Sequence, residues 1–495
     1  MSSTWRHLGA LRTVAEFQRR LAELGLDLPC DAAIEPGSAS PLASAIATPR
    51  INGKSIGNRW AIHPMEGWDG SRDGGVTDAV RRRWQRFGES GAKLICGGEA
   101  MAVRHDGRAN PHQLVIGQHT CGELTELLEL VRSVHARRYG SSDDLVVGFQ
   151  LTHSGRFSRP SAADQPAPRV AMRHPLLDAR FHVTSDAQVL SDAEVDELID
   201  CFVGAAAVAH QAGADFVDIK HCHGYLWHEF LGAHRRQGRY GGSFENRTRP
   251  LRAIVAGIRA SGNPIDLAVR LSVFDSVPFQ ALLAQAGQRD GGFGVPADVT
   301  GHLPYDYGFG IDRHRPSETD LREPLQFVAL CRELGVKILN ASAGSPYYCP
   351  HLQRPAAYPP SDGYAVDHDP LIDAVRLIGV ARQVRAVAGP AMVVVGTGYS
   401  YLQDFLPLVA QAVVREGWTD LVGLGRMVLS YPELPADVLA GRGLARKLVC
   451  RTFSDCTTAP RLGLPSGCYP LDHHYRAAPA ADQLKQLKQR RPGGE

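Results

Sequence analysis

The chain lacks long apolar runs, long basic runs and an excess of charge of either sign. No segment reaches the roughly 18 consecutive apolar residues of a membrane span, so we expect no membrane partner. The longest uninterrupted basic run is Arg81–Arg83 and the net charge is +2, which predicts no nucleic-acid partner. The N-terminal stretch "MSSTWRHLGALRTVAEF" has no unbroken apolar core, so we expect no secretory signal.

Cysteine is sparse. Ten cysteines are scattered over 495 residues, which is typical of reduced thiols and predicts a cytoplasmic protein. The composition, 44% hydrophobic and 21% charged, is that of a globular protein with a large core.

Short apolar runs alternate with helical patterns through most of the chain. The runs are "WAIHPM" (60–65), "KLICGGEA" (93–100), "LVVGFQL" (145–151), "FVDIKH" (216–221), "LAVRLS" (267–272), "KILNASAG" (337–344), "MVVVGTG" (392–398) and "LVGLGR" (421–426). Near-continuous apolar strands separated by helices indicate a parallel sheet covered by helices. Eight such units predict an α/β fold of the (β/α)8 TIM barrel type.

The remaining segments flank this barrel. We divide the chain into an N-terminal helical extension (1–48), the barrel (49–440) and a C-terminal extension (441–495). Apolar residues at helical spacing predict a helix over 5–25 that ends at Gly25.

The clearest helix signal within the barrel covers residues 192–212. Ser191 can cap it, Glu194 completes a capping box and Gly213 ends it.

The stretch 273–323, before a predicted helix at 324–335, is unusually long and rich in Gly, Pro, Asp and Tyr. A loop of that length in a compact domain is usually functional or disordered. Because it follows a barrel strand, we expect it to cover the active-site mouth. Tyr305 and Tyr307 are interpreted as loop anchors rather than substrate contacts.

In a barrel, side chains at the carboxyl ends of the strands face the ligand. Those positions hold Pro64, Met65, Glu66, Glu99, Ala100, Gln150, His153, Lys220, His223, Tyr225, Arg270, Gly396, Gly398, Gly425 and Arg426. Glycines followed by an arginine after the last two strands fit a phosphate site. Gln150 and Arg270 suit the polar edges of a heterocycle. The pattern therefore favours a phosphorylated cofactor over a bare metal ion.

The segment "DIKHCHGYLWHEF" (218–230) raises three alternatives: a metal site, an acid–base site over a cofactor, or ordinary loop chemistry. Neighbouring side chains of a strand face opposite sides, so the "HCH" spacing of His221 and His223 is weak evidence for a zinc site. We therefore predict no metal site. His221 and His228 are interpreted as packing residues.

Five motifs resemble those of a known family. In order within residues 42–435, "NRWAIHPMEG", "FQLTHSGR", "HGYLWHEFLGAHRRQGRYGGSFENR", "AVRLS" and "DLVGLGRMVLSYPEL" resemble the old yellow enzyme family of FMN-dependent NADH:flavin oxidoreductases. The resemblance agrees with the count of eight strand–helix units. Within "RYGGSFENR" we expect a structural role, with Glu245 and Arg247 as a buried pair.

The resemblance implies FMN across the barrel mouth and NAD(P)H as reductant. It assigns Pro64, Met65 and Glu66 to the flavin ring, Ala100 and Gln150 to its pyrimidine edge, Arg270 to N1 and O2, and Gly396, Gly398, Gly425 and Arg426 to the phosphate. Tyr225 matches the family's proton donor to the substrate carbon, and His223 matches one of the two residues that bind the substrate oxygen. His153 either supports the flavin site or caps a loop.

Two positions depart from the family. Lys220 replaces the usual histidine of the oxygen-binding pair, and Glu66 replaces the usual Thr or Cys near the flavin C4 carbonyl. An ionised carboxylate there would oppose flavin reduction, so we expect Glu66 to be protonated or paired with Lys220. Lys220 is predicted to be a charged clamp, acting with His223, which leaves ketone, carboxylate and phenolate open as the ligand group.

The C-terminal stretch resembles the dienoyl-CoA reductase branch of the family, which carries an iron–sulfur cluster. Cys456 and Cys468 have the branch's final spacing, but Val449 and Thr452 stand at the first two ligand positions and Cys450 is one position off. We therefore expect no four-cysteine cluster. The chain is also expected to lack the extra nucleotide-binding domains of that branch.

The resemblance implies an FMN-dependent oxidoreductase that takes hydride from NAD(P)H and reduces a carbonyl-activated alkene or related small molecule. A flavin-dependent dehydrogenase, desaturase or amine dehydrogenase is the main alternative. A flavin-binding protein without turnover and a metal-dependent barrel hydrolase are others. The sequence leaves the substrate, NADH against NADPH, and a homo-oligomeric state open.

Overall fold

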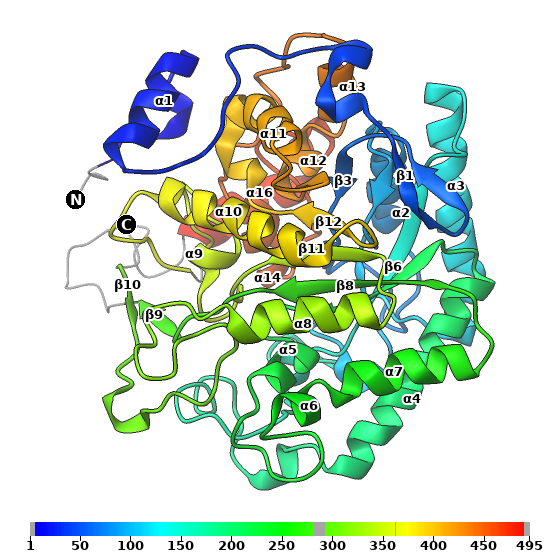
Figure 1. Ribbon diagram of the computed structural model, residues 1–495, viewed down its shortest axis with the longest axis vertical. Coiled ribbons are helices and arrows are strands. Elements are labelled where there is room, and N and C mark those ends of the chain that lie inside the picture. The colour runs from blue at the N-terminus through cyan, green and yellow to red at the C-terminus, as the bar shows by residue number, and fades with distance from the viewer. Residues whose placement is uncertain (1–4, 282–292, 362, 490–495) are drawn as a thin grey trace.

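The fold is built on a closed parallel barrel, seen in a computed structural model that describes residues 5–281, 293–361 and 363–489 (Figure 1). The barrel strands are β3 (Trp60–Ile62), β4 (Leu94–Ile95), β6 (Val146–Thr152), β7 (Phe216–His221), β8 (Asp266–Ser272), β11 (Ile338–Ser342), β12 (Val393–Gly396) and β13 (Leu421–Leu424). Neighbouring strands pair in parallel, and the β13–β3 and β4–β6 pairings close the ring. The predicted eight-stranded α/β barrel is therefore confirmed.

The predicted strand 93–100 is interrupted. Gly97 and Gly98 have φ values of +87° and +50°, a region that glycine adopts without steric cost. The chain turns there, and β5 (Ala100–Ala102) pairs with the carboxyl half of β6. The turn determines which side chains of this segment reach the barrel mouth.

Helices surround the barrel, as Figure 1 shows for α4, α7, α8 and α10. The longer ones are α2 (Asp78–Gly88), α3 (Cys121–Tyr139), α4 (Asp192–Gln211), α7 (Arg249–Ala260), α8 (Arg322–Glu333), α10 (Pro370–Ala388) and α11 (Leu406–Arg415). Shorter ones are α5 (Leu226–Leu231), α6 (Phe244–Arg247), α9 (Pro350–Gln353), α12 (Arg426–Ser430) and α13 (Leu434–Leu439). The predicted capping box of α4 is present: Ser191 Oγ accepts the Glu194 N–H, and the Glu194 carboxylate accepts the Ser191 N–H.

The N-terminal helix is shorter than predicted. α1 (Val14–Glu23) begins where Thr13 forms a capping box with Glu16, so the preceding residues are not part of it. A hairpin of β1 (Ile46–Ile51) and β2 (Lys54–Ile56) follows. Its isoleucines join the cluster of side chains inside the barrel, so the hairpin packs against one end of the barrel interior.

The predicted Glu245–Arg247 pair is wrong. Arg247 Nη2 donates to Glu323 Oε1 of α8 at 2.6 Å, while Glu245 is exposed. Residues two apart on a helix do not face each other, and α6 is a single helical turn.

Two further segments flank the barrel. β9 (Phe279–Ala281) and β10 (Gly294–Pro296) form an antiparallel pair within the predicted insertion 273–323, of which residues 282–292 lie outside the described part. α14 (Asp455–Arg461), α15 (His473–Arg476) and α16 (Pro479–Gln489) follow the barrel. Asp472 accepts a hydrogen bond from Arg82 of α2, which links this C-terminal segment to the barrel helices.

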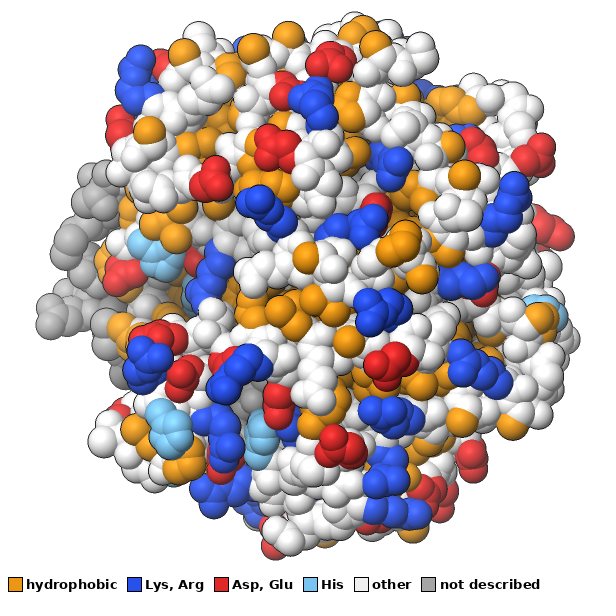
Figure 2. All heavy atoms as spheres, in the orientation of Figure 1, with side chains coloured by type: hydrophobic (Ala, Val, Ile, Leu, Met, Phe, Trp, Pro, Cys, Tyr) orange, Lys and Arg blue, Asp and Glu red, His pale blue; other side chains and the backbone are white. Residues whose placement is uncertain are grey.

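The surface in Figure 2 carries acidic and basic side chains intermingled, in keeping with the small net charge. Among the described residues, no helix combines the length and apolarity that crossing a membrane requires.

Candidate active site

A cavity of about 240 Å³ lies at the carboxyl ends of the barrel strands. It brings together most residues that the strand-end rule selected. Those that line it are Pro64, Met65, Glu66, Ala100, Gln150, Lys220, His223, Tyr225, Arg270, Gly398, Gly425 and Arg426.

Three of the selected residues do not line this cavity. The Glu99 carboxylate is buried against Arg83 and accepts from Trp84, because the glycine turn before it directs the side chain away from the cavity. His153 is buried and its Nδ1 accepts the Gly155 N–H, so it caps a loop. Gly396 is not among the lining residues.

The Asp218 carboxylate is buried between Gln150 and Arg270. Its Oδ2 accepts from Gln150 Nε2 and its Oδ1 from the Arg270 backbone N–H, both at 2.7 Å, while Arg270 Nη1 donates to the Pro64 carbonyl at 3.0 Å. Burial raises the pKa of Asp218 to about 6, against the lowering effect of Gln150 and Arg270. Arg270 Nε is buried without a hydrogen-bond partner in the described chain, so the guanidinium retains a donor for a ligand.

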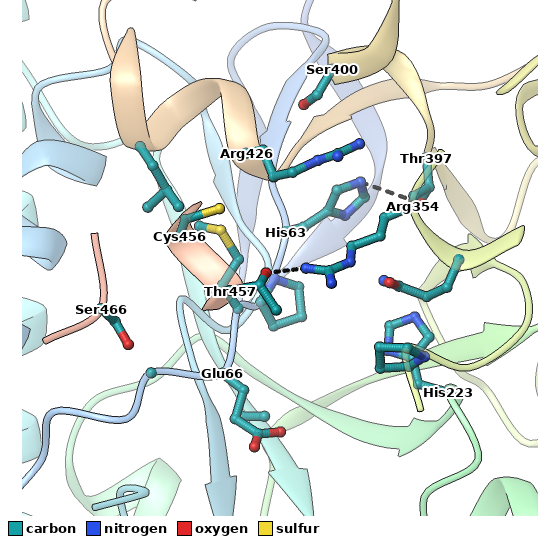
Figure 3. A pocket seen from close by; sticks show the side chains of 18 of the residues that line it. His63, Glu66, His223, Arg354, Thr397, Ser400, Arg426, Cys456, Thr457 and Ser466 are labelled. Carbon is teal, nitrogen blue, oxygen red and sulfur yellow. Dashed lines mark hydrogen bonds between the residues drawn. The ribbon is translucent and has the colours of Figure 1, made fainter. Parts of the chain in front are cut away.

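Arg426 supplies a second unsatisfied guanidinium three strands away. Its Nη2 donates to the Pro355 carbonyl at 2.7 Å, while Nη1 is buried without a partner among the described residues. Figure 3 shows it near Ser400 and Thr397, at the end of the pocket far from Glu66 and His223. A side chain at the neighbouring Gly425 would enter open space, so the backbone there borders the cavity.

Lys220 lies at the Glu66 end of the cavity. Its Nζ is 3.8 Å from Glu66 Oε2 and 3.4 Å from the centre of the Tyr225 ring. This geometry supports the expected pairing with Glu66. Burial lowers the pKa of Lys220, and the Glu66 carboxylate acts in the opposite direction. No acceptor within the described chain takes a hydrogen bond from this ammonium group.

Tyr225 connects two side chains of the cavity. Its hydroxyl donates to Glu66 Oε2 and lies 2.9 Å from the Tyr347 hydroxyl. Burial, reinforced by Glu66 and Tyr347, raises the pKa of Tyr225 well above its ordinary range. Tyr225 is therefore a neutral phenol at physiological pH.

His223 is held in an uncommon backbone conformation. Its φ is +65°, which costs free energy for a non-glycine residue and often marks a functional position. Its N–H donates to Ser272 Oγ, and its Nε2 lies 2.8 Å from Ser342 Oγ. Burial, then Arg270 and Lys220, hold the pKa of His223 well below its ordinary range, so the ring is neutral.

Sequence reasoning missed part of the cavity wall. Tyr347 follows β11, and the strand-end rule applied to this sixth barrel strand would have found it. Arg354 crosses the pocket in Figure 3 and donates to Thr457 of α14. No strand signal marks α14, which contributes Cys456, Thr457 and Arg461 to the wall.

The described parts of the insertion 273–323 do not line this cavity, contrary to the expectation that it covers the mouth. Tyr305 instead hydrogen-bonds His174 at 3.2 Å and packs against Tyr307. These contacts agree with a role as loop anchors. The insertion follows a barrel strand, but none of its described residues is part of the cavity wall.

His221 and His228 each have a local partner. His221 Nδ1 contacts the Ile219 carbonyl, and His228 Nδ1 accepts the Gly224 N–H, as expected of packing residues. In the part of the chain that the structure describes, no group of three or more His, Cys, Asp or Glu is arranged to hold a metal ion.

Comparison with known proteins agrees with this arrangement. Residues 49–288 match the NADH:flavin oxidoreductase / NADH oxidase family. The chain is 24% identical over 395 residues to an NADH oxidase of Thermoanaerobacter brockii, covering 79% of this chain but only 50% of that protein. It is 27% identical over 396 residues to an NADPH dehydrogenase of Geobacillus sp., covering 78% of this chain and 90% of that protein.

The fold is shared with a solved old yellow enzyme homologue from Zymomonas mobilis. The TM-score is 0.54 at 20% identity, over 83% of this chain and 96% of the homologue. By sequence similarity over residues 49–288 the chain groups with the NADH:flavin oxidoreductase / NADH oxidase family, and the Zymomonas mobilis structure shows that the two proteins share the barrel fold.

Proposed function

We propose that the protein binds FMN in this cavity and uses NAD(P)H to reduce a small alkene that a carbonyl group activates. The observation that carries the proposal is the pair of buried, unsatisfied guanidinium nitrogens, Arg426 Nη1 and Arg270 Nε, in one cavity. A phosphate and an electron-rich heterocycle edge are the groups that such donors bind.

These residues fit the cofactor. Arg426, with the backbone at Gly398 and Gly425, would hold the phosphate, and Arg270 with Gln150 would bind the pyrimidine edge. Pro64, Met65, Glu66 and Ala100 would border the ring. When bound, FMN supplies a group that accepts hydride from NAD(P)H and passes it to the substrate.

The chain's own side chains then bind and protonate the substrate. Lys220 and the neutral His223 would donate hydrogen bonds to the substrate oxygen and stabilise the negative charge that develops there. Tyr225 would give its proton to the adjacent carbon. Its position beside Lys220 puts the acid and the oxygen-binding groups at one end of the cavity.

The experiment measures turnover by the purified yellow protein with NADPH or NADH and 2-cyclohexenone. We expect enone-dependent oxidation of one nicotinamide, and Tyr225→Phe should lower the rate by about 10²-fold or more, the usual scale for a general acid. Bound FMN without enone turnover would contradict the proposed reaction.

One observation favours a second candidate, oxidation of a substrate. The Tyr225 hydroxyl donates to the Glu66 carboxylate, which would help the phenol oxygen to take a proton from a substrate. The same protein should then reduce an artificial electron acceptor when given an amine or a saturated ketone. Turnover with those substrates and none with 2-cyclohexenone would select the dehydrogenase.

A further inference from the structure

The Glu66 carboxyl lies against the residue proposed to protonate the substrate. Its Oε2 accepts the hydrogen bond of the Tyr225 hydroxyl and faces the Lys220 ammonium at 3.8 Å. Its Oε1 is buried without a hydrogen-bond partner in the described chain. With the carboxylate ionised, the Tyr225 proton points at Glu66 rather than at a substrate.

We propose that Glu66 supplies the proton that Tyr225 delivers, so that Glu66, Tyr225 and the substrate carbon form a two-proton relay. The inference rests on the proposed function. When Glu66 carries a proton, it becomes the donor to the Tyr225 oxygen, and the Tyr225 O–H is free to point into the cavity.

The step balances as follows. Hydride from the NAD(P)H-reduced FMN adds to one substrate carbon and leaves an electron pair on its neighbour. The Tyr225 O–H bond breaks as a C–H bond forms at that neighbour, and the Glu66 O–H bond breaks as the Tyr225 O–H forms again. Glu66 is left as a carboxylate beside Lys220, and water at the cavity mouth returns its proton.

A relay removes the need for a free tyrosinate. Burial, with Glu66 and Tyr347, raises the pKa of Tyr225 well above its ordinary range, so a lone phenolate would be strongly disfavoured. Transfer of a second proton from Glu66 avoids that species. Lys220, 3.4 Å from the ring centre, favours negative charge on either partner as the protons move.

Tyr347 is the competing donor, since its hydroxyl is 2.9 Å from that of Tyr225. Burial, reinforced by Glu66, raises the pKa of Tyr347 too, and the hydrogen bond with Tyr225 opposes the shift. A phenol is ordinarily a weaker acid than a carboxyl group by several pKa units. We therefore assign the supply of the proton to Glu66. Tyr347 holds the Tyr225 hydroxyl in position through its hydrogen bond.

The test separates the two half-reactions by anaerobic stopped-flow, with Glu66→Gln and Tyr347→Phe as matched variants. Glu66→Gln keeps the side-chain size but removes the titrating group. Reduction by NADPH is measured separately on the same samples, and we expect reoxidation by 2-cyclohexenone to slow by about 10²-fold. Tyr347→Phe should slow reoxidation by less than about tenfold, because it removes only one hydrogen bond.

Two readouts distinguish a relay from a structural role. The first is the reoxidation rate in mixtures of H2O and D2O. Plotted against the deuterium fraction, the wild-type rate should follow a curve, because two protons move. The Glu66→Gln rate should follow a straight line, because only one does. In the flavin-free protein, lowering the pH should produce an infrared carboxylic-acid band that is absent in Glu66→Gln and displaced in Tyr225→Phe.

The relay would be overturned if Glu66→Gln reoxidised as fast as wild type and kept the curved dependence on deuterium. A large fall in the reoxidation rate of Tyr347→Phe alone would make Tyr347 the proton source. Failure of the proposed function looks different, because the wild-type reduced flavin would then not be reoxidised by the enone. The infrared arm would still decide the relay, and an unshifted band in Tyr225→Phe would count against it.

Discussion

Lys220 is a buried ammonium group whose contacts leave its hydrogen-bond donors to a ligand. The Glu66 carboxylate is 3.8 Å from the Lys220 ammonium, beyond hydrogen-bond distance. The other close neighbour is the face of the Tyr225 ring, which has no lone pair to accept a conventional hydrogen bond. A lysine has three N–H donors, which are costly to bury unsatisfied. A ligand oxygen that accepts from Lys220 removes that cost.

Lys220→Met should therefore weaken a bound phenolate by roughly ten- to a hundredfold, the equivalent of one charge-assisted hydrogen bond of about 1.5–3 kcal/mol. The measurement is a titration of 4-hydroxybenzaldehyde followed by the visible absorbance of the flavin, at a pH where the ligand is ionised. Flavin occupancy should not change. Lys220→His is the matched control and should favour neutral phenols. Equal affinity of Lys220→Met and wild type for the phenolate would leave Lys220 as a structural partner of Glu66.

At the scale of elements, local sequence signals correctly located the helix that connects β6 to β7. Ser191 and Glu194 of α4 satisfy each other's backbone N–H groups, and Glu194 also pairs with Arg169. Ser191→Ala removes the side-chain acceptor at the N-cap, which typically costs about 1 kcal/mol. We expect a lower midpoint of thermal unfolding. Ser133→Ala, in the exposed part of α3, is the control and should have no destabilising effect.

Two segments compete for the role of covering the cavity, and the contacts favour the C-terminal one. α14 lines the cavity through Arg461 and Thr457, whereas Arg313 of the insertion bonds Asp306 away from it. Arg461→Ala should raise the KM for an enone carrying a carboxylate by about three- to tenfold, because it removes positive charge from the wall. Arg313→Ala should leave that KM within twofold. The reverse ranking in steady-state kinetics would restore the insertion as the cover.

At the scale of the whole molecule, the features common to all strand–helix units of the barrel could be predicted from the sequence, and features particular to one segment could not. Continuous apolar strands such as β7 and the strand-end positions of Lys220 and Arg270 follow from rules that apply to every unit of a parallel barrel. Glu99 was misplaced because a two-glycine turn reversed its direction. The contribution of α14 depends on long-range packing that no local pattern encodes. The domain limits at residues 48 and 440 stay a prediction.

The proposed cofactor couples the two ends of the cavity to the stability of the whole fold, because a ligand that binds only the native state stabilises it by mass action. FMN and riboflavin differ only by the phosphate, so they form a matched pair of probes for Arg426. Added to the flavin-free protein, FMN should bind at least tenfold more tightly than riboflavin and raise the midpoint of thermal unfolding further.

In Arg426→Ala, which removes the unsatisfied Nη1 donor, the two flavins should bind with nearly equal affinity. Riboflavin affinity itself should stay within about threefold of wild type, because the ring contacts of Arg270 and Gln150 are untouched. Flavin fluorescence titration gives all four dissociation constants, and a preference for FMN that survives in Arg426→Ala would place the phosphate elsewhere in the cavity.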